Sequence, residues 1–498
     1  MNALDRAILA VSPKWGADRL KNRMLADQFK AYDAAQPGRN RKTKIRNVSG
    51  TTAIHGSAES IRGQARYLDE NHDIVIGILN ILEQKVVGPK GISVEPMPFT
   101  VAGEKHEDFA KQLADYFQEF STAPDTTGEM SREEMERLNC RSWLRDGEMF
   151  GKFIEGNVAN FKHNTKVPLS IECLEADFLP YHKQDGERIH QGLERNQWGQ
   201  PLAFHFYQNH PGSQTGFRSK TNRVSADNVL HLKYTNRLRQ NRGISILHGV
   251  ITRLEDLKDY EESERVAARI SAVLAAYVTK APGNTGRVQE DGERIMEMSP
   301  GMFFDGLMPG EEIGTIQSNR PSALLQPFRD SMIKAVASGS RGTASTIGQN
   351  FDGSYSAQRQ EMVEGYAGYE TLQRMFITKW SKPVYRRLVD MGIANGDLTP
   401  PADLDMSTVH NAIYLGPVMP WIDPDKEVKA HERSVKAGFS TEAQVIRSKG
   451  SNPQEVKRQR QQEVKENLER DLIFSSDARH ENQIPPEIPE QPAQTEEE

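Results

Sequence analysis

The stretch that most constrains the fold is Ser245–Lys280, which contains no proline and no glycine after Gly249. Its apolar residues recur at steps of three and four, the spacing of one helix face. They are Leu247, Ile251, Leu254, Leu257, Val266, Ile270, Val273, Leu274 and Tyr277. We predict one helix about 45–50 Å long, which stops at Ala281–Gly283. Such a helix needs neighbours on more than one side.

Charge interrupts the middle of this predicted helix at Tyr260–Arg265. Across Arg253–Arg269 six acidic residues outnumber four basic ones. The alanines that follow, between Ala267 and Ala276, allow a second helix to approach closely. The pattern is typical of a helix with packing partners on its sides and one solvent-exposed face. The alternative is a long core helix of a large enzyme, also with one solvent-exposed face.

Length and charge bound the function. A chain of 498 residues can form two or three domains. Its net charge of −6 argues against a tight duplex-DNA binder, because such proteins gain affinity from an excess of Lys and Arg. No apolar run is long enough for a membrane span, and residues 1–23 lack the pattern of a secretory signal. The isolated Cys140 and Cys173 are expected to be buried in a protein of a reducing compartment.

The part before the long helix predicts a mixed α+β domain. Helices are expected at residues 1–30 (two pieces), 57–68 with Ser57 as cap, 73–87 with Asn71 as cap, 109–120 and 132–146. Strands are expected at residues 92–96, 150–155, 169–174, 192–195, 202–207, 224–228 and 229–233. The basic segment Gln36–Arg46 is either a nucleic-acid arm or a solvated linker.

The part after the long helix alternates loops and helices. A small β-containing insertion is expected at residues 283–320, and a second helix at 327–338. A polar loop follows at Thr343–Tyr355, then a very long helical run, Ser356–Met391, with a bend allowed at Pro383. A last helical region runs from Trp421 to about Leu472. The acidic, proline-rich residues 475–498 are expected to be disordered.

Enzymatic motifs are missing from the sequence. It contains no phosphate-binding GxxxxGK[ST], no dinucleotide GxGxxG after a strand, no HExxH, no GxSxG and no EF-hand loop. The adjacent pairs Glu133/Glu134 and Glu261/Glu262 point about 100° apart on a helix, so they are more simply solvated faces than acid–base pairs. We therefore expect no catalytic residue, no metal and no cofactor.

The order of short motifs over residues 53–463 resembles the lambda-type family of portal proteins of tailed bacteriophages. The motifs are Val86–Ile92 after a helix, Arg145–Glu148 before a strand, Glu175–Asp177, Trp198–Phe206, Asp227–His231, Tyr355–Arg359 and Trp421–Glu427. Each is weak alone, but their order over most of the chain is specific. This sequence departs from the family at Gly353–Tyr355, where an Asn-Tyr-Ser-Ser-like motif is usual.

The resemblance implies a portal fold assembled as a ring, usually of twelve subunits. Its wing would be residues 1–244, with the N-terminal arm, and 356–420. The stem helices would be 245–281 and 325–342, the clip 282–324, the tunnel loop 343–355 and the crown 421–474. Residues 475–498 would be the tail.

The resemblance also implies where contacts would lie. The channel and stem candidates are Arg253, Glu255, Lys258, Glu261, Glu262, Glu264, Arg265 and Lys334. The candidates for DNA contact in the tunnel loop are Gly348, Gln349, Asn350, Phe351, Asp352 and Gly353. The candidates for terminase or adaptor contact in the clip are Arg287, Glu290, Asp291, Glu293 and Arg294.

The function implied is a channel at one capsid vertex for packaging and ejecting DNA, in a virion assembled in the host cytoplasm. The expected partners are further copies of the chain, weakly and non-specifically bound double-stranded DNA, the terminase large subunit, head-completion or adaptor proteins, and major capsid and scaffolding proteins. No membrane partner is expected. Two alternatives stay open: another phage structural ring protein, and a DNA-processing enzyme with a divergent site.

Overall fold

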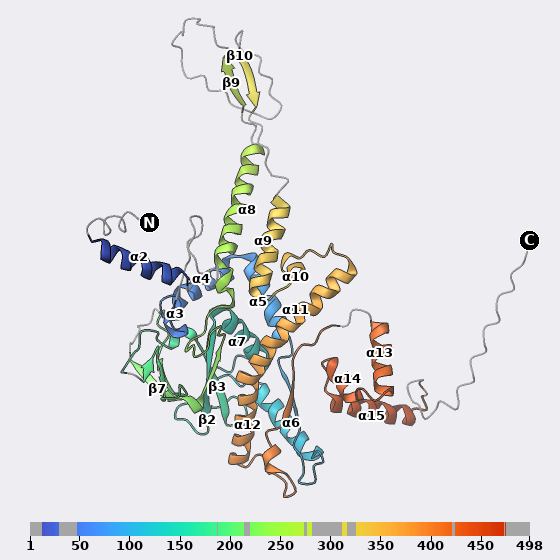
Figure 1. Cartoon of the computed structure of the whole chain (residues 1–498). Helices are drawn as coiled ribbons and strands as arrows, with labels where there is room; N and C mark the ends of the chain where they lie inside the picture. The colour runs from blue at the N-terminus through green and yellow to red at the C-terminus, as the bar shows by residue number, and fades with distance from the viewer. Residues whose placement is uncertain are drawn as a thin grey trace, which may run out of the picture. The chain divides into compact units, whose positions relative to one another are not determined.

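The computed structural model describes residues 12–28, 47–186, 188–213, 220–272, 276–280, 311–315, 325–420, 424–472 and 474. By its internal contacts the chain divides into two units, Met1–Ala53 and Ile54–Glu498. The first unit contains α2 (Pro13–Gln28), and α3 (Gly50–His55) crosses the boundary. The rest of this description concerns the second unit, which mixes helices and sheets as expected (Figure 1).

Four helices precede the main sheet, close to their predicted positions. They are α4 (Ala58–Asn71), α5 (Asp73–Val86), α6 (Glu107–Ser121) and α7 (Arg132–Asp146). The capping box between Ser131 and Glu134 fixes the start of α7. The predicted cap of α5 is wrong, because Asn71 still belongs to α4 and donates its side chain to the Tyr67 carbonyl. His72 occupies the cap position instead. Ser57 also makes no side-chain cap bond to α4.

Two antiparallel sheets form the β part of the domain. The first has the order β3-β2-β8, from β2 (Glu148–Glu155), β3 (Leu169–Glu175) and β8 (Val229–Lys233). The second has the order β4-β5-β6-β7, from β4 (Ile189–His190), β5 (Leu193–Arg195), β6 (Pro201–Tyr207) and β7 (Thr221–Ser225). Separately from these two sheets, β1 (Ser93–Pro96) pairs with β11 (Ala412–Leu415). Short 3₁₀ turns include η2 (Ala176–Phe178), η3 (Ala226–Asn228) and η6 (Met406–Thr408).

The first sheet is buried on both faces, so its strands alternate between two cores. On one face Met149, Phe153 and Leu232 join the large core of the helices. On the other face Phe150 and Val229 pack with residues of the second sheet, including Phe204 and Phe206. The three-stranded sheet therefore lies between the helices and the second sheet.

The long helix is shorter than predicted. A 3₁₀ turn, η4 (Ile246–Gly249), precedes α8 (Ile251–Ala272), and β9 (Ala276–Lys280) is a strand paired with β10 (Glu311–Thr315). The prediction of helix to Lys280 is wrong because Tyr277-Val278-Thr279 favours a strand once β10 offers a partner.

The helix α9 (Leu325–Ser340) runs antiparallel to α8 (Figure 1). The Tyr260 ring contacts Phe328 toward one end of the pair, and Gly339 lies against Val250 at the other. An ion pair of 2.8 Å between Arg329 and Glu261 also joins them. The two helices thus form a hairpin that begins at the sheet domain.

The run after α9 contains more helix than predicted. The first turn of the predicted loop is a short helix, α10 (Ala344–Gly348), because Ile347 packs into the core. The long helical run is confirmed as α11 (Tyr355–Phe376), a π-helical turn η5 (Ile377–Ser381) and α12 (Lys382–Asn395). Pro383 lies in the first turn of α12, directly after the π-helical turn η5.

Three helices end the described chain: α13 (Pro424–Lys436), α14 (Glu442–Ser448) and α15 (Pro453–Glu469). This agrees with the predicted helical region, whereas residues 475–498 lie outside the described residues. No helix within the described ranges is long and apolar enough to cross a membrane. Cys140 is buried as expected, and Cys173 is partly buried, with its sulfur accepting from the Asn139 side chain.

Candidate functional site

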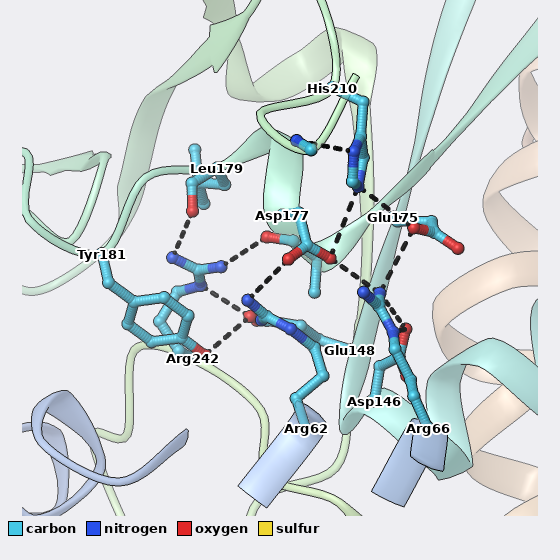
Figure 2. Close-up of polar contacts among 12 residues, drawn as sticks. Arg62, Arg66, Asp146, Glu148, Glu175, Asp177, Leu179, Tyr181, His210 and Arg242 are labelled. Carbon is cyan, nitrogen blue, oxygen red and sulfur yellow. Dashed lines mark hydrogen bonds and ion pairs between the residues drawn. The ribbon is translucent and has the colours of Figure 1, made fainter. Parts of the chain in front are cut away.

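A network of buried polar side chains lies where the chain leaves the sheet domain and enters η4 and α8. Its centre is Arg242, whose side chain is fully buried. The Nε of Arg242 donates to Glu148 at 2.6 Å, and a terminal nitrogen donates to the Leu179 carbonyl (Figure 2). The terminal nitrogens also donate to the carbonyls of Ala176 and Gln191. The guanidinium also stacks on the Tyr181 ring, 3.9 Å from its centroid. One side chain therefore joins β2, η2, the turn before β5 and the segment leading to α8.

Glu148, the first residue of β2, is equally buried. Besides Arg242, it accepts hydrogen bonds from the Gly243 amide at 2.9 Å, His231 at 2.9 Å and the Tyr181 hydroxyl at 3.3 Å. Burial raises the pKa of Glu148, but the Arg242 charge and the bonds from His231 and Gly243 outweigh burial and lower the pKa to about 2. The carboxylate is therefore ionised at neutral pH.

His231 completes the first set of contacts from strand β8. Burial lowers the pKa of His231 to about 4, although the neighbouring Glu148 opposes this shift. The ring is therefore neutral at pH 7 and donates from Nε2 to Glu148. It also stacks on Phe150, with 4.6 Å between the centroids. The pair Glu148–Arg242 thus has a neutral donor beside it rather than a second cation.

Two glycines allow the chain segments to cross at this point. Gly147 has a positive φ of 90°, at the end of α7. A Cβ on Gly243 would collide with the Gly147 carbonyl, and a Cβ on Gly147 would collide with the backbone of Ile244. Since only glycine permits this approach, the junction requires glycine at both positions.

A second network lies beside the first and centres on Arg66 of α4. Arg66 binds Asp146 at 2.6 Å and Asp177 at 2.7 Å, and approaches Glu175 at 3.3 Å (Figure 2). Arg62, one turn earlier, binds the other oxygen of Asp177 at 2.9 Å. The network fastens α4 to the ends of α7 and β3.

One part of this network has the spacing of a metal site. Ligand atoms of Glu175, Asp177 and His210 lie within 4.8 Å of one another. The guanidinium of Arg66 already contacts both carboxylates, and Arg62 contacts Asp177 as well. Because these cations supply the counter-charge, the arrangement is that of an ion-pair network rather than a metal centre.

Sequence reasoning missed the role of these residues. The sequence indicates Arg145–Glu148 and Glu175–Asp177 only as family motifs, whereas in the structure their acidic side chains form the two networks. A charged residue at the start of a buried strand, as in Asp146-Gly147-Glu148, was a usable signal because buried charges require partners. Nothing in the sequence indicated that Arg242 was the partner of Glu148.

The structure separates the predicted stem candidates by exposure. Arg253, Glu262, Arg265 and Lys334 are exposed, and Glu255, Lys258 and Glu261 are half-buried. Lys258 donates to the Asn71 carbonyl, and Glu261 binds Arg329. Glu264 differs from the others because it is only 3% exposed within one subunit. Its side chain therefore does not face solvent.

The predicted tunnel-loop candidates are brought together between α10 and α11. Gln349, Asn350, Phe351, Asp352 and Gly353 are exposed, and Gly348 is half-buried at the end of α10. Gln358 of α11 donates to the Phe351 and Gly353 carbonyls, so the loop is held at its base. The clip candidates Arg287, Glu290, Asp291, Glu293 and Arg294 lie outside the described residues.

Comparison with known proteins supplies a family. Residues 36–373 match the lambda family of phage portal proteins. The probable portal protein of Halomonas phage phiHAP-1 is 23% identical over 430 residues, which cover 83% of this chain and 81% of that protein.

Two solved structures are also similar to this chain, at 12% identity. For a chain from the neck of a native gene transfer agent particle, the TM-score is 0.43, with 81% of this chain and 99% of that chain covered. For a chain from the virion of a native gene transfer agent particle, the TM-score is 0.40, with 84% and 97% covered.

The match over more than half of the chain, together with the motif order, defines the class as a phage portal protein, a structural rather than an enzymatic class. Within that class the chain belongs to the lambda family.

Proposed function

We propose that copies of this chain form a ring of twelve subunits at one capsid vertex, the channel through which DNA is packaged and later ejected. Membership of the portal family supports this assembly. The observation that carries the proposal is the antiparallel pair α8–α9, which begins directly at the buried Glu148–Arg242 junction. A repeated contact between different faces of neighbouring copies closes such subunits into a ring.

The predicted parts follow in the proposal. The helices α8 and α9 form the stem, the sheet domain with α11 and α12 forms the wing, and α13–α15 form the crown. Residues 282–324 form the clip, which receives the terminase large subunit and later the head-completion or adaptor protein. The wing contacts major capsid and scaffolding proteins, so the protein resides at the portal vertex of the virion.

The exposed charges on α8 would allow a DNA duplex to slide past this helix without binding tightly. The acidic excess in the sequence does not remain on the surface, because Glu261 is paired with Arg329 and Glu264 is buried. Among residues 253–269 the exposed charges are balanced: Asp256, Asp259, Glu262, Arg253, Arg265 and Arg269. A wall of mixed signs offers phosphate no deep minimum, so DNA binding is weak and non-specific.

Particle imaging tests the assembly. We expect class averages of the purified protein to show rings with a central channel, a wide wing and a narrow stem. Mass photometry of the same sample should give a mass near twelve times 56.1 kDa. A monomer or compact dimer at every salt concentration would contradict the proposal.

A further inference from the structure

A cavity of about 730 Å³ lies between the second sheet, strand β8 and the helical run α11–η5. Its volume is in the range of small-ligand and peptide side-chain sites. Phe204, Pro201 and Met375 form apolar parts of its wall. The cavity borders the buried junction through His231, but its other polar lining residues belong to neither network described above.

The polar lining of this cavity is positive. It contains Arg195, Lys233, Arg374 and Lys379, and no Asp or Glu. Arg195 donates to the Gly199 carbonyl, while its buried Nε has no partner among the described residues. The Lys233 amine donates only to the carbonyls of Gln240 and Asn241 within the same range. Arg374, which is exposed, pairs with Glu370 of its own helix at 2.6 Å. Among the described residues no ion pair joins Arg195, Lys233 or Lys379 to a carboxylate, so these three leave the cavity positively charged.

Desolvation increases the need for a negative occupant. Burial, together with the nearby Arg195 charge, lowers the pKa of Lys233 to about 8. Burial alone lowers the pKa of Arg195. Both groups would be stabilised in their charged forms by an anion placed between them. A ligand with both apolar and acidic groups would complement the apolar and the basic residues that line the cavity.

The chain itself contains such a segment. Residues 475–498 hold seven Asp or Glu and one Arg, a balance of −6 that equals the net charge of the whole chain. They also hold Ile484, Ile488 and four prolines, which supply apolar groups. A segment of this length can span about 80 Å when extended, so the cavity need not adjoin the end of α15.

We propose that the C-terminal segment 475–498, from the same or a neighbouring copy, binds in this cavity. Its glutamates pair with Lys233, Lys379 and Arg195, and its Pro and Ile side chains lie against Phe204 and Met375. Binding would neutralise the cavity and fasten the chain end to the sheet domain.

Zero-length carbodiimide cross-linking of the full-length protein, followed by peptide mass spectrometry, tests this binding. We expect amide bonds that join the amines of Lys379 or Lys233 to glutamates of the segment, such as Glu487 or Glu490. Replacing Arg374 and Lys379 by Glu should reduce the links to Lys233 at least about tenfold, because like charges would face the segment. The double variant Lys111→Glu/Lys162→Glu, at exposed positions outside the cavity, is the charge-matched control.

A second variant carries its substitutions only in the C-terminal segment 475–498, so the residues of the cavity are unchanged. Replacing the seven acidic residues of the segment by Gln or Asn should leave the assembly intact and raise hydrogen exchange in β8 and η5. The proposal is overturned if the segment forms no links to the cavity lysines, or links equally to Lys111. It is also overturned if the links persist after charge reversal, or if inorganic phosphate binds the cavity while the segment stays unlinked.

Discussion

Glu148 and Arg242 are both fully buried, so each depends on the other for its counter-charge. We predict that Glu148→Gln destabilises the protein by about 3–5 kcal/mol, because it leaves a buried guanidinium unpaired. The double variant Glu148→Gln/Arg242→Met should recover part of this loss. Urea unfolding measures both. Lys436→Gln, which breaks an exposed pair with Glu432, is the control and should cost less than about 1 kcal/mol.

His231 makes stability depend on pH in a defined window. Its pKa is about 4 in the folded protein, against about 6.5 when unfolded, so the unfolded chain binds the proton first as pH falls. Stability should therefore decline from pH 6.5 to pH 4, by up to about 3 kcal/mol from this residue. Thermal unfolding across this range should show a shallower decline in His231→Gln. An unchanged slope would contradict the assignment.

Gly243 lies where the segment before η4 crosses the end of α7, so a substitution at Gly243 tests this crossing. We predict that Gly243→Ala prevents correct folding of the junction, because the added Cβ meets the Gly147 carbonyl and backbone must shift. Gly249→Ala is a matched control six residues later, where a Cβ meets no atom within 4 Å. Soluble yield and unfolding midpoint should fall for the first variant only. Equal behaviour of both variants would show that the crossing is tolerant.

At the scale of elements, the loop between α10 and α11 can be tested by deletion. Removing Gln349–Gly353 takes away exposed residues only, since the core residue Ile347 lies in α10. We predict that rings still form and that DNA packaging or retention is impaired, because the proposed contact with the DNA backbone is lost. Particle imaging and packaged-DNA content measure the two effects. Loss of the ring would show that these residues serve assembly instead.

The spacing of apolar residues predicted the positions of most helices well, but it placed the end of the long helix wrongly. The apolar spacing located α7 at its observed bounds and α9 to within two residues. It failed at Ala276–Lys280, where the same spacing continues but strand β10, more than thirty residues later, offers a partner. Pairing over that distance has no local signature, so sequence periodicity could not reveal it.

At the scale of the whole molecule, one ion pair fastens the last helices to the sheet domain. Arg447 of α14 binds Glu95 of β1 at 3.0 Å, and Glu95 is only 2% exposed. We predict that Arg447→Ala raises hydrogen exchange in α13–α15 and in β1, because it leaves a buried carboxylate unpaired. Arg458→Ala at an exposed position of α15 serves as the comparison, and a rise equal to that of Arg447→Ala would contradict a specific role for the pair.

The sequence indicated the mixed helix-and-sheet class and the family, because periodicity and motif order are properties of the linear chain. It did not indicate the junction, because Glu148, His231 and Arg242 are far apart in sequence and meet only in the fold. The cavity beside the junction was hidden for the same reason: its basic residues come from β5, β8, α11 and η5.

The π-helical turn Ile377–Ser381 fixes the rotational phase of the long helical run. A π turn accommodates one more residue than an α turn, and each residue turns a helix by about 100°. Shortening this turn by one residue would make the helix regular, yet would rotate Tyr385 and Leu388 of α12 away from the core that buries them. The run from α11 to α12 therefore admits changes of residue type more readily than changes of length.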